Sequence, residues 1–160
     1  MIESKLEKSP LVSILMNCFN GEKYLREAID SVIEQTYPNW ELIFWDNQST
    51  DSSASIVKSY SDLRIRYYYS PTHALLYEAR NYAFEKASGE LIAFLDVDDS
   101  WAPVKLQRQV PVFLDPAVGV SASNYFIDQQ LKAKRFLAHK KPMPSGKVLD
   151  TLLRYTMLDW

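Results

Sequence analysis

The feature that most constrains the fold of this chain is a regular alternation of short, mostly apolar runs with segments of helical spacing. Strands are predicted over residues 11–16, 41–45, 64–69 and 90–95, and helices over 25–33, 50–60 and 75–89. A chain that alternates strand and helix in this way predicts an α/β fold, in which helices flank a mostly parallel sheet.

Residues that favour helix ends lie at the borders of these segments. Thr50 or Asp51 is a suitable N-cap for the second helix, and Gly89 is suited to end the third as a left-handed C-cap. Pro103 fits the first turn of a further helix that runs to about Phe113.

The pattern weakens after Pro116. Strands are predicted over 118–123 and 135–139, a loop over 140–147 and a helix from 148 onward. The chain therefore divides into a polar lead-in (1–10), a regular α/β part (11–116) and a less regular part (117–160).

Composition excludes several classes of protein. With 160 residues, 47% of them hydrophobic, the chain is long enough for about one domain with a real core. A formal charge of −2 gives no sign of nucleic-acid binding. The single cysteine, Cys18, forms no internal disulfide, and the first ten residues are too polar for a signal peptide. We expect a cytoplasmic protein. These features do not decide whether it also contacts the inner face of a membrane.

Polar residues follow every predicted strand of the α/β part. The four exits read "NCFN", "DNQSTD", "SPTH" and "DVDD". Because ligands of parallel sheets bind beyond the carboxyl ends of the strands, we expect a small-molecule site at this edge.

The "DVDD" stretch gives the sharpest chemical signal. Asp96, Asp98 and Asp99 repel one another unless a cation lies nearby or the side chains fan out into water. Carboxylates two residues apart beyond a strand can grip Mg²⁺ or Mn²⁺ from one side, while water and phosphate oxygens complete the shell. In the alternative reading, Asp99 or Ser100 caps the next helix and the other acids face solvent.

The loops after the first two strands offer groups suited to a nucleobase. Asp46 can accept the imide N–H of uracil, and Asn47 can both accept and donate. Phe19 can stack on the base. The alternatives are Asx turns for the two polar residues and a place in the core for Phe19.

Two residues near the third helix have less specific roles. Arg80 can reach a phosphate, or it can pair with Glu78 or Glu85 on the helix surface. His73 is interpreted as a loop residue, since no cluster of partners indicates a metal ligand.

The order of "VSILMNCFNGEKYLREAIDSVIEQTYPNWELIFWDNQSTDSS" and "EARNYAFEKASGELIAFLDVDDSW" resembles glycosyltransferase family 2. The resemblance covers residues 11 to about 110 with the motifs in the family's order and spacing. It implies a Rossmann-like GT-A fold and an inverting enzyme that depends on a nucleotide sugar. The 11–116 part then corresponds to the nucleotide-sugar-binding half, and 117–160 to the start of an incomplete acceptor-binding part.

The resemblance also implies roles for the base-facing residues. Phe19, followed by Asn20 in the same loop, holds the position that stacks on the base. Asp46 and Asn47 hold the positions of the acidic pair that reads it, with UDP as the default nucleotide.

Further roles are implied near the phosphates. Arg80 and Asn81 match the family's "ARN" segment beside the nucleotide. Asp96, Val97 and Asp98 match its DxD motif, in which the first acid lies near the ribose and the metal and the second binds Mn²⁺ or Mg²⁺ directly.

The catalytic base is not identified. Inversion by single displacement needs a carboxylate that takes the proton of the attacking hydroxyl. The acids beyond the "DVDD" stretch that match no motif for this base are Asp115, Asp128, Asp150 and Asp159. We therefore expect this chain to be the donor-binding portion of a longer transferase, whose acceptor is a glycan or a lipid-linked glycan.

Two other functions remain open from the sequence. Haloacid-dehalogenase phosphatases also place D-x-D after an apolar strand, with the first aspartate, here Asp96, as nucleophile. A non-catalytic module that binds sugar nucleotides is the third reading.

Overall fold

The computed structural model describes residues 9–129, 134–138, 140 and 145–146. The chain forms two compact units, Met1–Gly119 and Val120–Trp160, and each is described by itself. Among the described residues, no helix has both the length and the apolarity to span a membrane.

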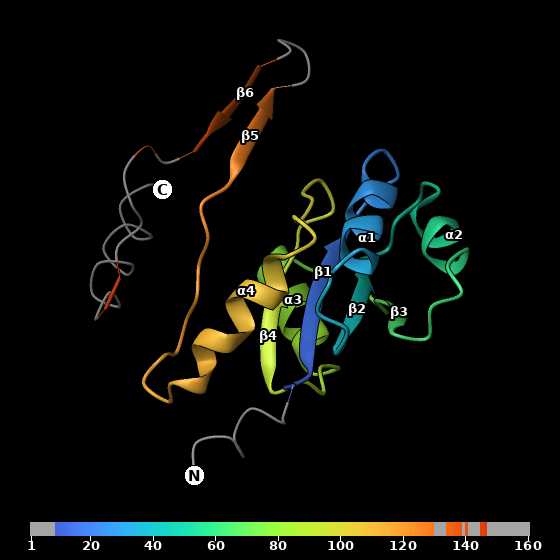
Figure 1. Cartoon of the computed structure of the whole chain (residues 1–160). Coiled ribbons are helices and arrows are strands. Elements are labelled where there is room, and N and C mark those ends of the chain that lie inside the picture. Colours follow the sequence, from blue (N-terminus) through green and yellow to red (C-terminus); the bar gives the residue numbers. More distant parts are fainter. Residues whose placement is uncertain (1–8, 130–133, 139, 141–144, 147–160) are drawn as a thin grey trace. The chain divides into compact units, whose positions relative to one another are not determined.

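The first unit is built on a four-stranded parallel sheet in the order β3-β2-β1-β4 (Figure 1). The strands are β1 (Val12–Cys18), β2 (Trp40–Asp46), β3 (Ile65–Tyr69) and β4 (Leu91–Phe94). The helices are α1 (Leu25–Ile33), α2 (Ser53–Lys58), α3 (Leu76–Phe84) and α4 (Lys105–Gln109), which continues into a 3-10 helix, η2 (Val110–Leu114). The predicted α/β fold with a parallel sheet is confirmed.

Helices cover both faces of this sheet because the side chains of a strand alternate between its faces. Ile14 and Phe44 lie on one face, in a buried cluster with residues of α1, α2 and α4. Leu15 and Ile43 lie on the other face, against Ala79 of α3. Central strands that are buried on both sides explain the almost uninterrupted apolar runs of β1 and β2.

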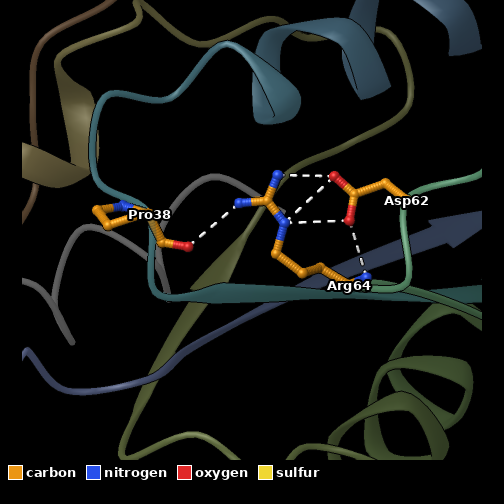
Figure 2. A network of polar contacts seen from close by, with 3 residues as sticks. All are labelled: Pro38, Asp62 and Arg64. Carbon is orange, nitrogen blue, oxygen red and sulfur yellow. Dashed lines mark hydrogen bonds and ion pairs between the residues drawn. The ribbon is translucent and has the colours of Figure 1, made fainter.

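The amino ends of the strands are tied together by two polar groups of residues. Arg64, just before β3, binds the Asp62 carboxylate and donates to the Pro38 carbonyl oxygen (Figure 2). Its guanidinium also lies 3.7 Å from the centre of the Trp40 ring. These contacts fix the entry of β3 beside the entry of β2.

The second group, here the Glu41 network, joins Glu41 to residues of every other strand or its entry. Glu41 Oε1 accepts from Ser13 Oγ at 2.6 Å and from the Ser88 backbone N–H at 2.7 Å. Glu41 Oε2 accepts from Arg66 at 2.8 Å, and Ser13 Oγ in turn accepts from the Gly89 N–H. The network therefore spans all four strands of the sheet.

The predicted helix borders are partly wrong. α3 ends at Phe84, and Gly89 is not its left-handed cap. Gly89 instead lies so close to β1 that a Cβ atom would be 2.5 Å from the carbonyl oxygen of Leu11. α2 begins at Ser53, and the Asp51 carboxylate accepts the Ser53 N–H at 2.9 Å, which satisfies a free donor of the first turn.

The strand predicted over 118–123 is wrong. In the second unit, β5 (Phe126–Gln129) pairs antiparallel with β6 (Lys134–Leu137). Residues 118–123 pair with no strand of the described part, and the Val118 N–H instead donates to the Asp115 carbonyl oxygen at 3.0 Å. The predicted helix from 148 onward lies outside the described residues.

Candidate functional site

The loops after β1 and β2 are held together by hydrogen bonds at the carboxyl edge of the sheet. Asn20, with a positive φ of 55°, accepts the Thr50 N–H with its side-chain oxygen at 2.8 Å. Glu22 and Asp51 each receive a backbone N–H from the other's loop, at 2.8 and 2.9 Å. The first two rim loops, as we name the loops that follow β1, β2 and β3, are thus fastened to each other.

Asp46, the last residue of β2, is fully buried. Its Oδ1 accepts the Ser49 N–H at 2.7 Å, and its Oδ2 accepts the Tyr67 hydroxyl at 2.7 Å. Both oxygens therefore serve the protein itself, and the first bond is the local turn contact expected in the alternative reading. Direct contact between Asp46 and a base stays a prediction.

Asn47 fastens the loop after β3 to the end of β2. Its side-chain amide donates to the Ala74 carbonyl at 2.8 Å, and its side-chain oxygen accepts the Ala74 N–H at 3.0 Å. The Asn47 side chain thus bonds to both backbone groups of Ala74, as a neighbouring strand would do. The loop after β2 therefore positions the loop after β3.

Phe19 is 52% exposed, so its alternative reading as a core residue is wrong. Its ring centre lies 4.5 Å from that of His73, and the ring planes meet at 67°. Nδ1 of His73 lies 2.9 Å from the carbonyl oxygen of Asn47. An exposed aromatic pair therefore stands at the meeting point of three rim loops.

The acids after β4 face solvent on either side of a partly buried valine. Val97 packs against the larger hydrophobic cluster, whereas Asp96, Asp98 and Asp99 are exposed. Desolvation of its carboxylate, together with the charges of Asp98 and Asp96, raises the pKa of Asp99. Helix α4 begins only at Lys105, so Asp99 and Ser100 do not cap it and that alternative reading is wrong.

Arg80 on α3 reaches across to the same acids. Its guanidinium lies 2.9 Å from Asp96 Oδ1 and 5.8 Å from the centre of the Phe94 ring. The ion pair therefore forms with Asp96, not with Glu78 or Glu85. Asn81, the next residue, is exposed on α3.

The acidic rim fits a divalent cation that keeps most of its water. No group of three or more His, Cys, Asp or Glu side chains is arranged to hold a metal ion in the part of the chain that the structure describes. Asp96 and Asp98, however, are exposed carboxylates separated by one anchored residue, and Mg²⁺ or Mn²⁺ binds through one or two carboxylates plus phosphate and water oxygens.

Sequence reasoning missed two residues of this rim. Tyr67, on the neighbouring strand β3, donates its hydroxyl to Asp46. This contact depends on how β3 pairs with β2, which the sequence does not reveal. His73 stood in the "SPTH" exit and was interpreted as an ordinary loop residue, although its place on the same edge was a usable signal. Of the predicted site residues, Phe19, Asn20, Asp46 and Asn47 are brought together by the contacts above, and Arg80 joins Asp96.

Comparison with known proteins identifies relatives of this arrangement. The family model "Glycosyl transferase family 2" matches residues 13–157. UDP-Glc:alpha-D-GlcNAc-diphosphoundecaprenol beta-1,3-glucosyltransferase WfgD of Escherichia coli is 38% identical over 132 residues, which are 82% of this chain and 52% of that protein. The chain spans about half the length of the curated relatives it matches.

Solved structures share the fold. The mannosyltransferase PcManGT from Pyrobaculum calidifontis, in complex with GDP-Man and Mn²⁺, superposes with a TM-score of 0.65 at 27% identity, over 73% of this chain and 39% of that one. S. aureus TarS 1-349 gives a TM-score of 0.61 at 25% identity, over 74% and 40%. The sheet with its flanking helices is thus the GT-A fold, as the resemblance implied, and the chain belongs to glycosyltransferase family 2.

Proposed function

We propose that this chain binds the nucleotide diphosphate sugar of an inverting glycosyltransferase and holds its diphosphate through a divalent cation at Asp96 and Asp98. The observation that carries the proposal is the pair of exposed carboxylates at the carboxyl end of β4, each beside the anchored Val97. They share this edge of the sheet with the exposed Phe19, which is suited to stack on a base.

The relatives support the choice of ligand. WfgD is named for UDP-Glc, and the PcManGT structure contains GDP-Man together with Mn²⁺. UDP is the proposed nucleotide because the curated relative named for it is the more similar of the two. Asp96 and Asp98 would hold the cation, which would offset the charge of the diphosphate and so favour departure of the nucleoside diphosphate.

The contact between Arg80 and Asp96 is compatible with this role. The side chains are 38% and 56% exposed, so the pair contributes at most about 1 kcal/mol. Asp96 can therefore exchange the guanidinium for a metal ion at little cost. Arg80 is then free to bind a phosphate oxygen, for which its planar guanidinium is well shaped.

The transfer itself needs an acceptor hydroxyl and a carboxylate base. We assign no residue as that base. The acceptor class that we propose is a glycan or a lipid-linked glycan, since WfgD is named for a diphosphoundecaprenol-linked one. A lipid-linked acceptor would bring the protein to a membrane surface. Family membership speaks against the phosphatase reading, while a non-catalytic module remains the outcome to exclude by assay.

Calorimetric titration of the chain with UDP, GDP and dTDP, each with and without Mn²⁺, tests the proposal. We expect UDP to bind about tenfold more tightly or better with Mn²⁺ than without it, because the cation offsets the repulsion between the diphosphate and the acids. Asp98→Ala should abolish this difference.

Asp115→Ala is the matched control, since Asp115 is also exposed but only caps a local turn through the Ala117 N–H. It should keep the full effect of Mn²⁺. Binding that does not depend on metal, or an Asp98→Ala variant with the affinity of the wild type, would contradict the proposed role. Little or no sugar transfer is expected from the donor-binding portion alone.

A further inference from the structure

Asp46, which is expected to read the base, has both carboxylate oxygens engaged within the protein in this structure. A nucleobase with a ring N–H needs an acceptor. Asp46 is fully buried with both oxygens bonded, and the side-chain oxygen of Asn47 accepts the Ala74 N–H. An exposed acceptor on the same edge could therefore read the base in their place.

His73 supplies such an acceptor. Its Nδ1 lies 2.9 Å from the backbone carbonyl oxygen of Asn47. Because a carbonyl oxygen can only accept, Nδ1 must carry the proton of this bond. In the neutral ring Nε2 then has a free lone pair. Among the residues that the structure describes, none is hydrogen bonded to Nε2.

The ring of His73 also forms a corner with Phe19. The centres lie 4.5 Å apart and the planes meet at 67°, and both residues are exposed. Because the two rings are steeply inclined, a base that stacks on the Phe19 ring turns its own edge toward His73. Stacking on an aromatic side chain suits every base, whereas contact at the edge distinguishes one base from another.

We propose that His73 is a specificity-determining residue of the nucleotide site, whose ring holds the base together with Phe19 and whose Nε2 accepts an N–H from the base edge. This inference rests on the proposed nucleotide binding. The bases it selects carry a ring N–H on that edge, as uracil, thymine and guanine do. Cytosine offers an unprotonated ring nitrogen there, so two acceptors would face each other.

Calorimetric titration with UDP and CDP in the presence of Mn²⁺ separates this inference from the function on which it rests. We expect the wild type to prefer UDP over CDP by about tenfold, the effect of one satisfied against one unsatisfied polar contact. A wild type that binds UDP and CDP equally would overturn the role of His73 and leave the nucleotide site standing. A wild type that binds neither would overturn both.

Two variants divide the possible roles of His73. His73→Phe keeps an aromatic ring beside Phe19 and loses both nitrogens. His73→Asn keeps a donor for the Asn47 carbonyl and loses the ring with its second nitrogen. Each should bind UDP about three- to tenfold more weakly and lose the preference over CDP. Thr72→Ala, in the same exposed loop, should keep it. A preference retained by either His73 variant would overturn the proposal.

A spectroscopic measurement does not depend on how the variants fold. The chain has two histidines, so the ¹⁵N resonances of His73 can be assigned by comparison with the spectrum of His73→Asn or with that of a His139 variant. In the free wild type, Nδ1 should be the protonated nitrogen, and the Nε2 resonance should move on addition of UDP. A protonated Nε2 in the free protein, or an Nε2 resonance unchanged at saturating UDP, would overturn the proposal.

Discussion

Gly89 is required by the space around it rather than by an unusual backbone conformation. A Cβ atom there would lie 2.5 Å from the Leu11 carbonyl oxygen and 2.7 Å from the backbone nitrogen of Ser13. Both neighbours belong to the backbone and cannot turn away as a side chain can. At Gly119, by contrast, an added Cβ atom meets nothing within 4 Å.

We therefore expect Gly89→Ala to lower the free energy of unfolding by about 1–3 kcal/mol, the usual effect of forcing an extra carbon into a packed site. Gly119→Ala is the matched control and should stay within about 0.5 kcal/mol of the wild type. Urea unfolding followed by circular dichroism measures both. Equal stability of the two variants would show that β1 and the entry of β4 are not in the close contact described.

Single residues also show where prediction from sequence succeeds and where it stops. The position of the "DVDD" acids at the edge of the sheet was predicted because their type and their place after a strand suffice. For Phe19 the same signals left a place in the core open, and only the family resemblance favoured the exposed position. The partners of Asp46 and Arg80 were not predicted, since Tyr67 and Asp96 reach them from other elements. Such contacts depend on register and on helix placement, which spacing along the chain does not determine.

At the scale of elements, the Glu41 network controls how the strands are held at their amino ends. Burial of the Glu41 carboxylate by itself raises its pKa. The hydrogen bonds from Ser13, Ser88 and Arg66 outweigh that effect and lower the pKa from 4.5 to about 2. Since each pKa unit is equivalent to about 1.4 kcal/mol, the ionised group contributes about 3 kcal/mol to stability.

The pH dependence follows from the sign of this change. The folded state binds the proton less tightly than the unfolded one, so the contribution is complete above pH 4.5 and is lost as the pH falls toward 2. Glu41→Gln should lower stability at pH 7 by about 1–3 kcal/mol and flatten the loss of stability between pH 5 and 2. Glu90→Gln, at an exposed position, serves as the control. Thermal melting across this pH range measures the stability of both variants. The same pH dependence of stability in the two variants would contradict the role given to Glu41.

The elements themselves were largely predictable. All four strands of the parallel sheet and its first three helices lie where the apolar runs and helical spacing predict them. The errors fall at helix ends and after Pro116. Gly89 matched a C-cap pattern, but α3 ends five residues earlier, and 118–123, with two valines among small residues, is not a strand. Local patterns identify a buried segment well, but they do not reveal whether a partner strand exists.

At the scale of the whole molecule, the first unit contains both hydrophobic clusters. Their buried residues run from Val12 to Val110, inside the unit that ends at Gly119. A unit with its own core is expected to fold by itself.

We therefore expect a chain ending at Gly119 to unfold cooperatively and to bind UDP with Mn²⁺ as the 160-residue chain does. Circular dichroism melting and calorimetry on both chains provide the comparison. A fragment that lacks a cooperative transition would show that the first unit depends on residues beyond Gly119. A folded fragment that does not bind UDP, beside a longer chain that does, would place part of the nucleotide site in the second unit.

The polarity of the parallel sheet separates two tasks that compete in many proteins. The Glu41 network and the Arg64 contacts hold the amino ends, while the rim loops and the acids after β4 occupy the carboxyl ends. We therefore expect changes in the rim loops to leave the contacts at the amino ends in place. On such a scaffold, the edge suited to a ligand is free to vary in sequence while the contacts at the opposite edge keep the strands together.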